Sequence, residues 1–259
     1  MQIADKVVVV TGGSNGIGRA LAERFVREGA RGVCIADVDE AEGKKVAAAS
    51  GARFVACDVR KEEDIVRLVR ETEKAFGPVD LFCGNAGIGV ADANGNVGGA
   101  SNADWQRIWE INVMAHVLAA RALLPGMIER KSGYFLITAS AAGLLSQIGS
   151  SAYSTTKHAA VGFAESLAIA HGDQGIGVSV LCPQGVLTNM TRGQGDTPQA
   201  NDGMLQPEDV AECVLQGLKE EHFLILPHPQ VLTYMQRKTA DYDRWIRGMQ
   251  RFRQKFSCP

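Results

Sequence analysis

Two side chains near the middle of the chain have the types and the spacing of an acid/base pair. Tyr153 and Lys157 lie four residues apart, directly before the helix-forming run 158–164. Residues four apart stand one above the other on a helix, so both side chains could face one pocket. A free tyrosine has a pKa of about 10, but a neighbouring cation favours the phenolate and lowers that pKa toward the working range of a general base. The pair could therefore take a proton from a substrate hydroxyl.

The same spacing occurs a second time, at Tyr234 and Lys238. The first pair begins a helix in the middle of the chain, whereas the second lies in a basic C-terminal tail. Spacing alone is thus a weak signal, and the elements around each pair must decide which one is catalytic.

A glycine-rich loop near the N-terminus has the placement of a nucleotide-binding loop. The β-branched run 6–11 predicts a strand buried on both faces, and residues 19–26 have a helical periodicity that stops near Gly29. Glycines between a strand and a helix let the backbone approach a pyrophosphate, which then lies on the helix N-terminus. The alternative is a glycine-rich turn without a ligand. The residues expected at the phosphates are Gly12, Ser14, Asn15, Gly16, Ile17 and Gly18.

Asp37 ends the second expected strand, 32–36. An acid at this place can accept hydrogen bonds from both ribose hydroxyls of an adenosine, and it repels a 2′-phosphate. The position favours NAD over NADP. In the alternative account, Asp37 merely caps the helix that begins near Glu40.

Two further strand ends extend this cleft. The strand 53–57 leads into Asp58 and Val59, which would lie near the adenine, although Asp58 could equally cap the next helix. The strand 79–83 is followed by small residues that let a cofactor approach the backbone, namely Asn85, Ala86 and Gly87.

In this order and spacing, the motifs resemble the short-chain dehydrogenase/reductase family over residues 4–226. The resemblance rests on Thr11-Gly12-x-x-x-Gly16-Ile17-Gly18, Asn85-Ala86-Gly87, Ser140 and Tyr153-x-x-x-Lys157. It selects Tyr153 over Tyr234, because only Tyr153 follows the serine and begins a helix after the fifth strand. The family implies an α/β fold, a single Rossmann-like doubly wound parallel sheet of about seven strands in the order 3-2-1-4-5-6-7, with helices on both faces. We expect residues 1–228 to form this catalytic domain and the tail 229–259 to belong to it or to an oligomer interface.

The resemblance also implies roles for four catalytic residues. Tyr153, as phenolate, takes the hydroxyl proton while a hydride passes to NAD, and Lys157 lowers the pKa of Tyr153 and bonds the nicotinamide ribose. Ser140 polarises the substrate oxygen. Asn112 perturbs its helix and holds a water that links Lys157 to solvent; the alternative is a core asparagine that is satisfied within the protein.

One motif departs from the family. The family usually has Pro-Gly-x-Val-x-Thr over the nicotinamide, and this chain keeps Pro183, Val186 and Thr188 but has Gln184 at the first glycine. Either the Gln184 side chain reaches into the substrate pocket, or Gly185 simply absorbs the lost backbone freedom.

The polar, glycine-containing stretch 189–206 is typical of a mobile lid over the substrate. The apolar residues 141–148 near it predict a mainly apolar pocket, in which Arg192 is the one cation near the inner positions. We expect a hydrophobic secondary alcohol or its ketone as substrate. The residues expected to contact it are Ala142, Gln147, Gln184 and Met190.

Composition limits the remaining possibilities. With 46% hydrophobic and 22% charged residues and a net charge of −2, we expect an ordered enzyme and no nucleic-acid partner. The N-terminus lacks a basic, apolar leader, so we expect a cytoplasmic protein. The six cysteines have no C-x-x-C spacing and the five histidines no metal-ligand spacing, so we expect reduced thiols and no metal.

The tail contrasts with the rest of the chain. Between residues 229 and 259, seven Lys or Arg stand against two Asp. Apolar residues at steps of three and four predict an amphipathic helix that packs on its own domain or on a neighbouring subunit, or that lies on a membrane surface. The family implies a homodimer or a homotetramer. The apolar positions are Tyr242, Trp245, Ile246, Met249, Phe252 and Phe256, with Arg244, Arg247, Arg251 and Lys255 on other faces.

Two classes of function remain from the sequence. The first is an NAD-dependent alcohol dehydrogenase, able to run as a ketone reductase. The second is a non-catalytic NAD-binding regulator or scaffold on the same fold, which the complete set of Asn112, Ser140, Tyr153 and Lys157 disfavours.

Overall fold

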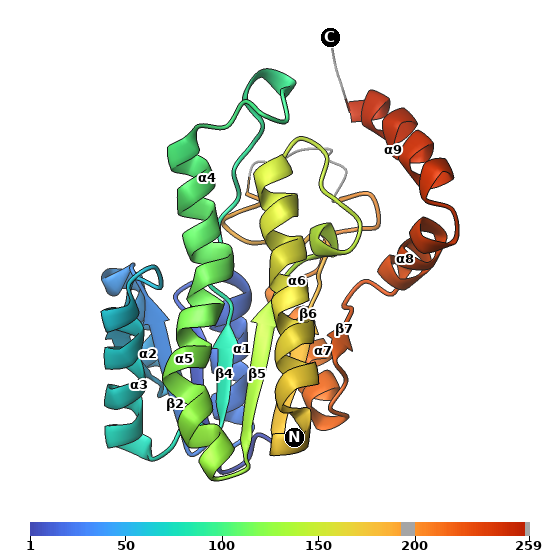
Figure 1. Cartoon of the computed structure of the whole chain (residues 1–259). Helices are drawn as coiled ribbons and strands as arrows, with labels where there is room; N and C mark the ends of the chain where they lie inside the picture. The colour runs from blue at the N-terminus through green and yellow to red at the C-terminus, as the bar shows by residue number, and fades with distance from the viewer. Residues whose placement is uncertain (193–199, 257–259) are drawn as a thin grey trace.

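A computed structural model describes residues 1–192 and 200–256 of the chain. Its centre is one sheet of seven parallel strands in the order β3-β2-β1-β4-β5-β6-β7, which confirms the expected topology (Figure 1). The strands are β1 (Val7–Thr11), β2 (Gly32–Asp37), β3 (Arg53–Ala56), β4 (Leu81–Gly84), β5 (Gly133–Thr138), β6 (Ile176–Leu181) and β7 (Leu224–Ile225).

Helices connect successive strands and cover both faces of the sheet (Figure 1). Those between the strands are α1 (Gly16–Arg27), α2 (Glu40–Ser50), α3 (Glu62–Phe76), α4 (Asn102–Trp109), α5 (Ala115–Glu129), α6 (Ser151–His171) and α7 (Pro207–Lys219). Two more, α8 (Gln230–Ala240) and α9 (Tyr242–Phe256), follow the last strand.

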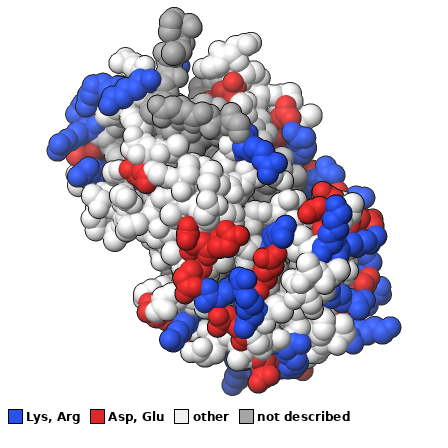
Figure 2. Space-filling view, turned by 180° about the vertical axis from the view of Figure 1, so that it is seen from behind, with Lys and Arg blue, Asp and Glu red and all other residues white. Residues whose placement is uncertain are grey.

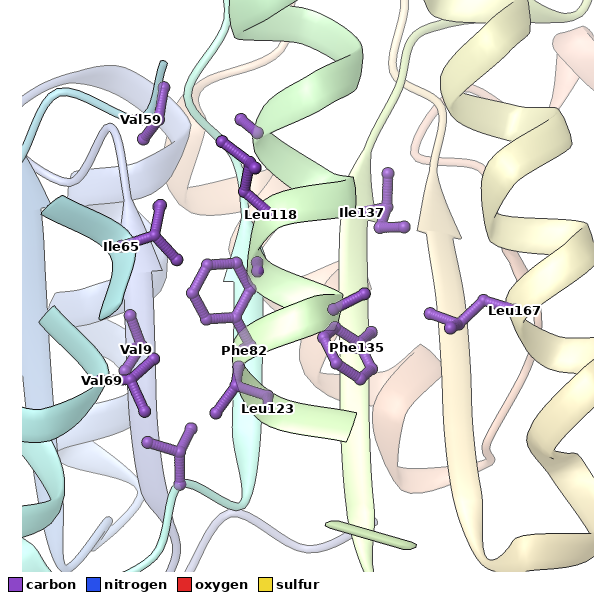
Figure 3. Close-up of a cluster of buried hydrophobic side chains, with 14 of the residues drawn as sticks. Val9, Val59, Ile65, Val69, Phe82, Leu118, Leu123, Phe135, Ile137 and Leu167 are labelled. Carbon is purple, nitrogen blue, oxygen red and sulfur yellow. The ribbon is translucent and has the colours of Figure 1, made fainter. Parts of the chain in front are cut away.

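The strands are buried on both faces because helices cover each side, as parallel sheets require. All five residues of β1 are buried, and they alternate between two cores: Val7 and Val9 belong to one, Val8 and Val10 to the other. Figure 3 shows the first core, where Phe82 and Phe135 project from neighbouring strands with ring centres 6.3 Å apart.

The strand order reverses beside β1, which pairs with β2 on one side and with β4 on the other. In a parallel α/β sheet, such a reversal opens a crevice at the carboxyl ends of the strands. The loops after these strands therefore meet at one edge of the sheet, and most of the residues that the sequence singled out lie in them.

The helices α4 and α5 form one continuous helical stretch that is joined by a π-helical turn at Glu110–Met114. By length and composition alone, the stretch Asn102–Glu129 could cross a membrane, but half of its most apolar window is buried inside the fold. Ser101 caps its N-terminus by accepting a hydrogen bond from the Asp104 N–H.

Candidate active site

A cavity of about 1730 Å³ opens at the carboxyl ends of the strands. It exceeds the roughly 300–1,000 Å³ of a pocket for one small ligand, so it has room for a cofactor and a substrate together. Of the residues selected from the sequence, Ser14, Gly18 and Asn112 are not in its wall. Those in the wall are Gly12, Asn15, Gly16, Ile17, Asp37, Asp58, Val59, Asn85, Ala86, Gly87, Ser140, Ala142, Gln147, Tyr153, Lys157, Pro183, Gln184, Val186, Thr188 and Met190.

Tyr153 lies in the first turn of α6, where its side chain is hydrogen-bonded to Ser140. Burial raises the pKa of Tyr153 above its usual value, and the hydrogen bond to Ser140 acts in the opposite direction. The Ser140 hydroxyl also accepts from the Ala142 N–H at 3.1 Å, which holds the serine at the end of the loop after β5. The two hydroxyl groups therefore stand side by side, where one substrate oxygen could contact both.

Lys157 lies one turn further along α6 and is almost fully buried. Its ammonium group donates to the Thr138 carbonyl at 2.8 Å and lies 5.6 Å from the centre of the Tyr153 ring. Burial lowers the pKa of Lys157 to about 8, because desolvation disfavours its charged form. Among the effects of the protein on the pKa of Tyr153, burial of the phenol is the largest and raises this pKa.

Asn112 lies behind Gly87 rather than in the cavity wall. Its side chain is fully buried, accepts from the Ile88 N–H at 2.9 Å, and donates to the Ile88 carbonyl and to the Thr156 hydroxyl. Each polar group of the side chain thus has a protein partner, as in a satisfied core asparagine. The helix is nevertheless perturbed at this residue, because the π turn Glu110–Met114 contains it.

Thr11, the last residue of β1, joins the glycine loop to the loop after β4. Its hydroxyl accepts from the N–H groups of Asn85 and Ala86 at 3.0 and 3.1 Å. Gly12 has a φ of +65°, and a Cβ on it would lie 2.9 Å from the Ala86 Cα, so only glycine suits this place. The motif containing Thr11 was visible in the sequence, but its joining role required knowing that β1 and β4 are neighbours.

Gly18 and Ser14 are not in the cavity wall and support the glycine loop through contacts within the protein. A Cβ on Gly18 would lie 2.2 Å from the Gly12 carbonyl oxygen, so the glycine lets α1 pack directly on the loop. Ser14 is fully buried, and its N–H donates to the Asp37 carboxylate at 3.0 Å.

Asp37 ends β2 in the cavity wall, and its carboxylate also accepts from the Asp39 N–H at 3.1 Å. The helix α2 is capped by Asp39, whose side chain accepts from the Glu42 N–H. The capping account of Asp37 is therefore wrong. A fixed carboxylate in this wall can accept from ribose hydroxyls and disfavours a phosphate.

Asp58 does not cap a helix either, because Lys61 is the residue before α3. The Arg60 guanidinium donates to both Asp58 oxygens, at distances between 2.6 and 3.1 Å, and holds the pKa of this carboxyl below its usual value. Arg60 itself lies in the cavity wall. The sequence analysis missed it, although its place two residues after Asp58 was a usable signal.

These groups follow the cavity in the order that the strands impose. Asp58, Asp37 and the glycine loop lie after β3, β2 and β1, and Ser140 and Pro183 lie after β5 and β6 on the other side. The close approach of backbone at Gly12, the acceptor at Asp37 and the buried cation Lys157 fit the phosphate, ribose and nicotinamide ends of NAD.

The segment after β6 places Gln184 in the wall of the cavity. Its N–H donates to the His228 Nδ1 at 3.2 Å, and its side-chain oxygen has no hydrogen-bond partner among the described residues. Gln184 thus has a buried side-chain oxygen at the edge of the pocket, and both accounts of this departure from the family stay open. Gly185 meanwhile accepts from the Leu205 N–H at 3.0 Å, which ties the segment to the end of the expected lid.

The expected lid 189–206 is described only in part, since residues 193–199 lie outside the described residues. These include Gln194, Gly195 and Asp196. Met190 lines the cavity and is 45% exposed, whereas Arg192 is exposed and is not in the wall.

The C-terminal helices form a part of the wall that the sequence analysis did not assign to the pocket. Residues of α8 and α9 face the cavity, among them Tyr234, Arg237, Trp245 and Met249. The second Tyr-x-x-x-Lys pair is divided between separate partners: the Tyr234 hydroxyl donates to Asp202, and the Lys238 ammonium to the Leu144 carbonyl. The apolar stripe of the tail was the feature of the sequence that could have placed these helices beside the pocket.

No group of three or more His, Cys, Asp or Glu side chains suited to a metal ion occurs within residues 1–192 and 200–256.

Comparisons with known proteins agree with this site. A family model described as short chain dehydrogenase matches residues 6–199. The chain is 35% identical over 239 residues to 1-deoxy-11-beta-hydroxypentalenate dehydrogenase of Streptomyces exfoliatus, covering 87% of this chain and 84% of that protein. It is 32% identical over 231 residues to the mitochondrial borneol dehydrogenase of Lavandula x intermedia, covering 88% of each.

Among solved structures, a short chain dehydrogenase/reductase from Burkholderia phymatum in complex with NAD superposes with a TM-score of 0.84. It is 30% identical and covers 94% of this chain and 96% of its own. The residues that the family model matches contain β1 to β6, with the glycine loop and the Tyr153–Lys157 helix. This chain belongs to the short-chain dehydrogenase/reductase family.

Proposed function

We propose that this protein is an NAD-dependent dehydrogenase of secondary alcohols that can also reduce the corresponding ketones. The observation that carries the proposal is the hydrogen-bonded pair Tyr153 and Ser140 beside the buried Lys157, in one cavity with the glycine loop and Asp37. A regulator that only binds NAD would not need this constellation, and the relatives named above are dehydrogenases.

The residues divide the reaction between them. NAD, when bound, accepts a hydride from the carbinol carbon of the alcohol. Ser140 donates to or accepts from the substrate oxygen and holds it beside the Tyr153 hydroxyl, and Tyr153 takes the proton that the alcohol loses. Lys157 keeps positive charge near the phenol, which opposes the effect of burial on the pKa of Tyr153.

NAD is the preferred cofactor because a carboxylate stands where the 2′-phosphate of NADP would lie. Asp37 is held by the N–H groups of Ser14 and Asp39, so it cannot turn away without leaving those donors unpaired.

The substrate is a mainly apolar molecule. Ala142, Leu145 and Ile148 line the cavity after Ser140, and Trp245 and Met249 line it from α9. Such a wall excludes water and stabilises an apolar body around the reacting carbinol.

We further propose that the protein works in a reducing compartment, the cytoplasm, as a homo-oligomer. The five cysteines within the described residues are unpaired, and four of them are buried. Light scattering after gel filtration would test the assembly, and fractionation of cells that express the full chain would test the location.

The activity is tested with purified protein, a panel of cyclic and linear secondary alcohols, and NAD or NADP. We expect NADH to form, which its near-ultraviolet absorbance measures. We also expect kcat/KM to be at least about 10-fold higher with NAD than with NADP, because a repulsion of about 1.4 kcal/mol between Asp37 and the 2′-phosphate is enough for that factor. Binding of NADH without turnover of any alcohol or ketone would instead support a regulator.

A further inference from the structure

Three arginines lie in the part of the cavity wall that the C-terminal helices form. Arg237 is on α8, and Arg244 and Arg251 are on α9. All three are exposed, and none forms an ion pair with any residue that the structure describes. Their charges are thus available to a ligand in the cavity.

Between Arg244 and Arg251 the same wall is apolar, while Asp241 lies in it between Arg237 and Arg244. Trp245, Met249 and Phe252 line the cavity from α9 and are partly buried, and Gly248 leaves space among them. The cavity-facing side of α9 therefore alternates guanidinium groups with large apolar groups. A basic helix face that only contacts solvent does not require large apolar groups among its arginines.

Two exposed residues of α9 that are not in the cavity wall provide an internal comparison. Arg247 and Ile246 are exposed and do not line the cavity. In the view from behind, basic residues gather at the end of the molecule where α9 lies (Figure 2). Basic residues of α9 thus occur both inside and outside the cavity wall, and Arg244 and Arg251 are the arginines of α9 that line the cavity.

We propose that the substrate carries a carboxylate at the end remote from the reacting carbinol, and that Arg237, Arg244 and Arg251 bind it. This inference rests on the proposed function and adds the substrate class. The apolar body would lie between the catalytic Tyr153 and Trp245, and the carboxylate would meet the arginines at the mouth formed by α8 and α9. A guanidinium group suits this role because it stays charged and donates two parallel hydrogen bonds to a carboxylate.

The sequence pointed to Arg192 as the one cation near the inner positions of the pocket. The three arginines of the wall come from the tail, more than 80 residues after Tyr153. Their position depends on how α8 and α9 fold back onto the cavity.

The kinetic test compares 9-hydroxydecanoate with 2-decanol, which share the carbinol and nearly the same chain but differ in the carboxylate. We expect the wild-type enzyme to prefer 9-hydroxydecanoate about 10-fold or more in kcat/KM, and the preference to shrink as salt rises. Each of Arg237→Gln, Arg244→Gln and Arg251→Gln should lower the preference about 2- to 5-fold, and the triple variant should bring it close to one. Arg247→Gln, at an exposed arginine of α9 that does not line the cavity, is the matched control and should keep the wild-type preference.

A binding measurement separates this inference from the proposed activity. Titration calorimetry of the NADH complex with dodecanoate should give a Kd that the triple variant raises about 10-fold and that Arg247→Gln does not change. Dodecyl phosphate serves as a second arm: tighter binding of the phosphate than of the carboxylate would assign the site to phosphorylated ligands and overturn the proposal. Turnover of 2-decanol with no carboxylate preference would also overturn it while leaving the dehydrogenase intact, whereas arginine-dependent binding of dodecanoate without any turnover would overturn the dehydrogenase alone.

Discussion

Burial and hydrogen bonding act in opposite directions on the pKa of the Tyr153 hydroxyl. Burial holds the proton on the phenol, and Ser140 and positive charge near the ring favour its release. Because burial lowers the pKa of Lys157 to about 8, the lysine loses its charge as the pH rises through that range. The charge states of Tyr153 and Lys157, which lie one turn apart on α6, therefore both depend on burial.

Tyr153→Phe removes the acid/base group and keeps the ring. We expect kcat to fall by at least about 100-fold, because general acid/base catalysis contributes about 10²–10⁴-fold, while the Kd for NADH stays within about 3-fold. Stopped-flow turnover and a fluorescence titration with NADH measure the two quantities. Tyr242→Phe, at a tyrosine that is 55% exposed, is the control, and near-normal rates in Tyr153→Phe would show that another group takes the proton.

At the scale of elements, the apolar stripe of the tail lies on α9 and is divided between two environments. Trp245, Met249 and Phe252 line the cavity, while Tyr242 and Ile246 are 55% and 47% exposed. The side chain of Phe256 lies outside the described part of the structure. The helix α9 packs on its own domain through Trp245, which lies against the small core formed by Ala141, Leu145 and Val231.

Trp245→Ala tests whether α9 is a wall of the substrate pocket. We expect KM for an apolar alcohol to rise about 10-fold and kcat to change less. A 10-fold rise corresponds to the loss of about 50–60 Å² of apolar contact, because each Å² contributes about 25 cal/mol. Steady-state kinetics at saturating NAD provides the measurement. Ile246→Ala shortens the neighbouring exposed side chain, and equal KM values in the two variants would place α9 away from the bound substrate.

At the scale of the whole molecule, buried polar groups link the active site to the stability of the fold. His116 follows the π turn in α5 and is buried next to Gly84, where a Cβ would lie 2.5 Å from its Nδ1. Burial, with a contribution from the Lys157 charge, lowers the pKa of His116 to about 3. The folded protein thus keeps a neutral imidazole in its core at neutral pH.

This shift makes the free energy of unfolding depend on pH. An unfolded histidine gains its proton below about pH 6.5, whereas the folded protein resists protonation down to about pH 3, so stability falls as the pH falls through this window. From pH 7 to about pH 4.5, His116 alone should account for a loss of about 3 kcal/mol, at about 1.36 kcal/mol for each pH unit below the unfolded pKa.

Urea unfolding of His116→Leu at both pH values measures this contribution. The acid-dependent loss should be smaller in the variant by about that amount, even if the variant is less stable at pH 7. His158→Leu, at an exposed histidine of α6, is the control. An equal acid-dependent loss in wild type and His116→Leu would mean that His116 already carries a proton in the folded state.

The sequence by itself determined the first strand with its glycine loop and the Tyr153–Lys157 helix, and the strand order followed from the resemblance to the family that these motifs carry. These depend on local patterns: β-branched runs followed by glycine, helical periodicity, and a motif spacing that short loops preserve. The helix Ser151–His171 follows from such signals as well.

Only the tertiary structure decided what depends on contacts between distant segments. Thr11 joins Asn85 because β1 and β4 are neighbours, Asp37 holds Ser14 because β2 lies beside β1, and the tail arginines reach the cavity because α8 and α9 fold back over it. The balance of effects on the pKa of Tyr153 likewise depends on burial, which no spacing in the sequence measures.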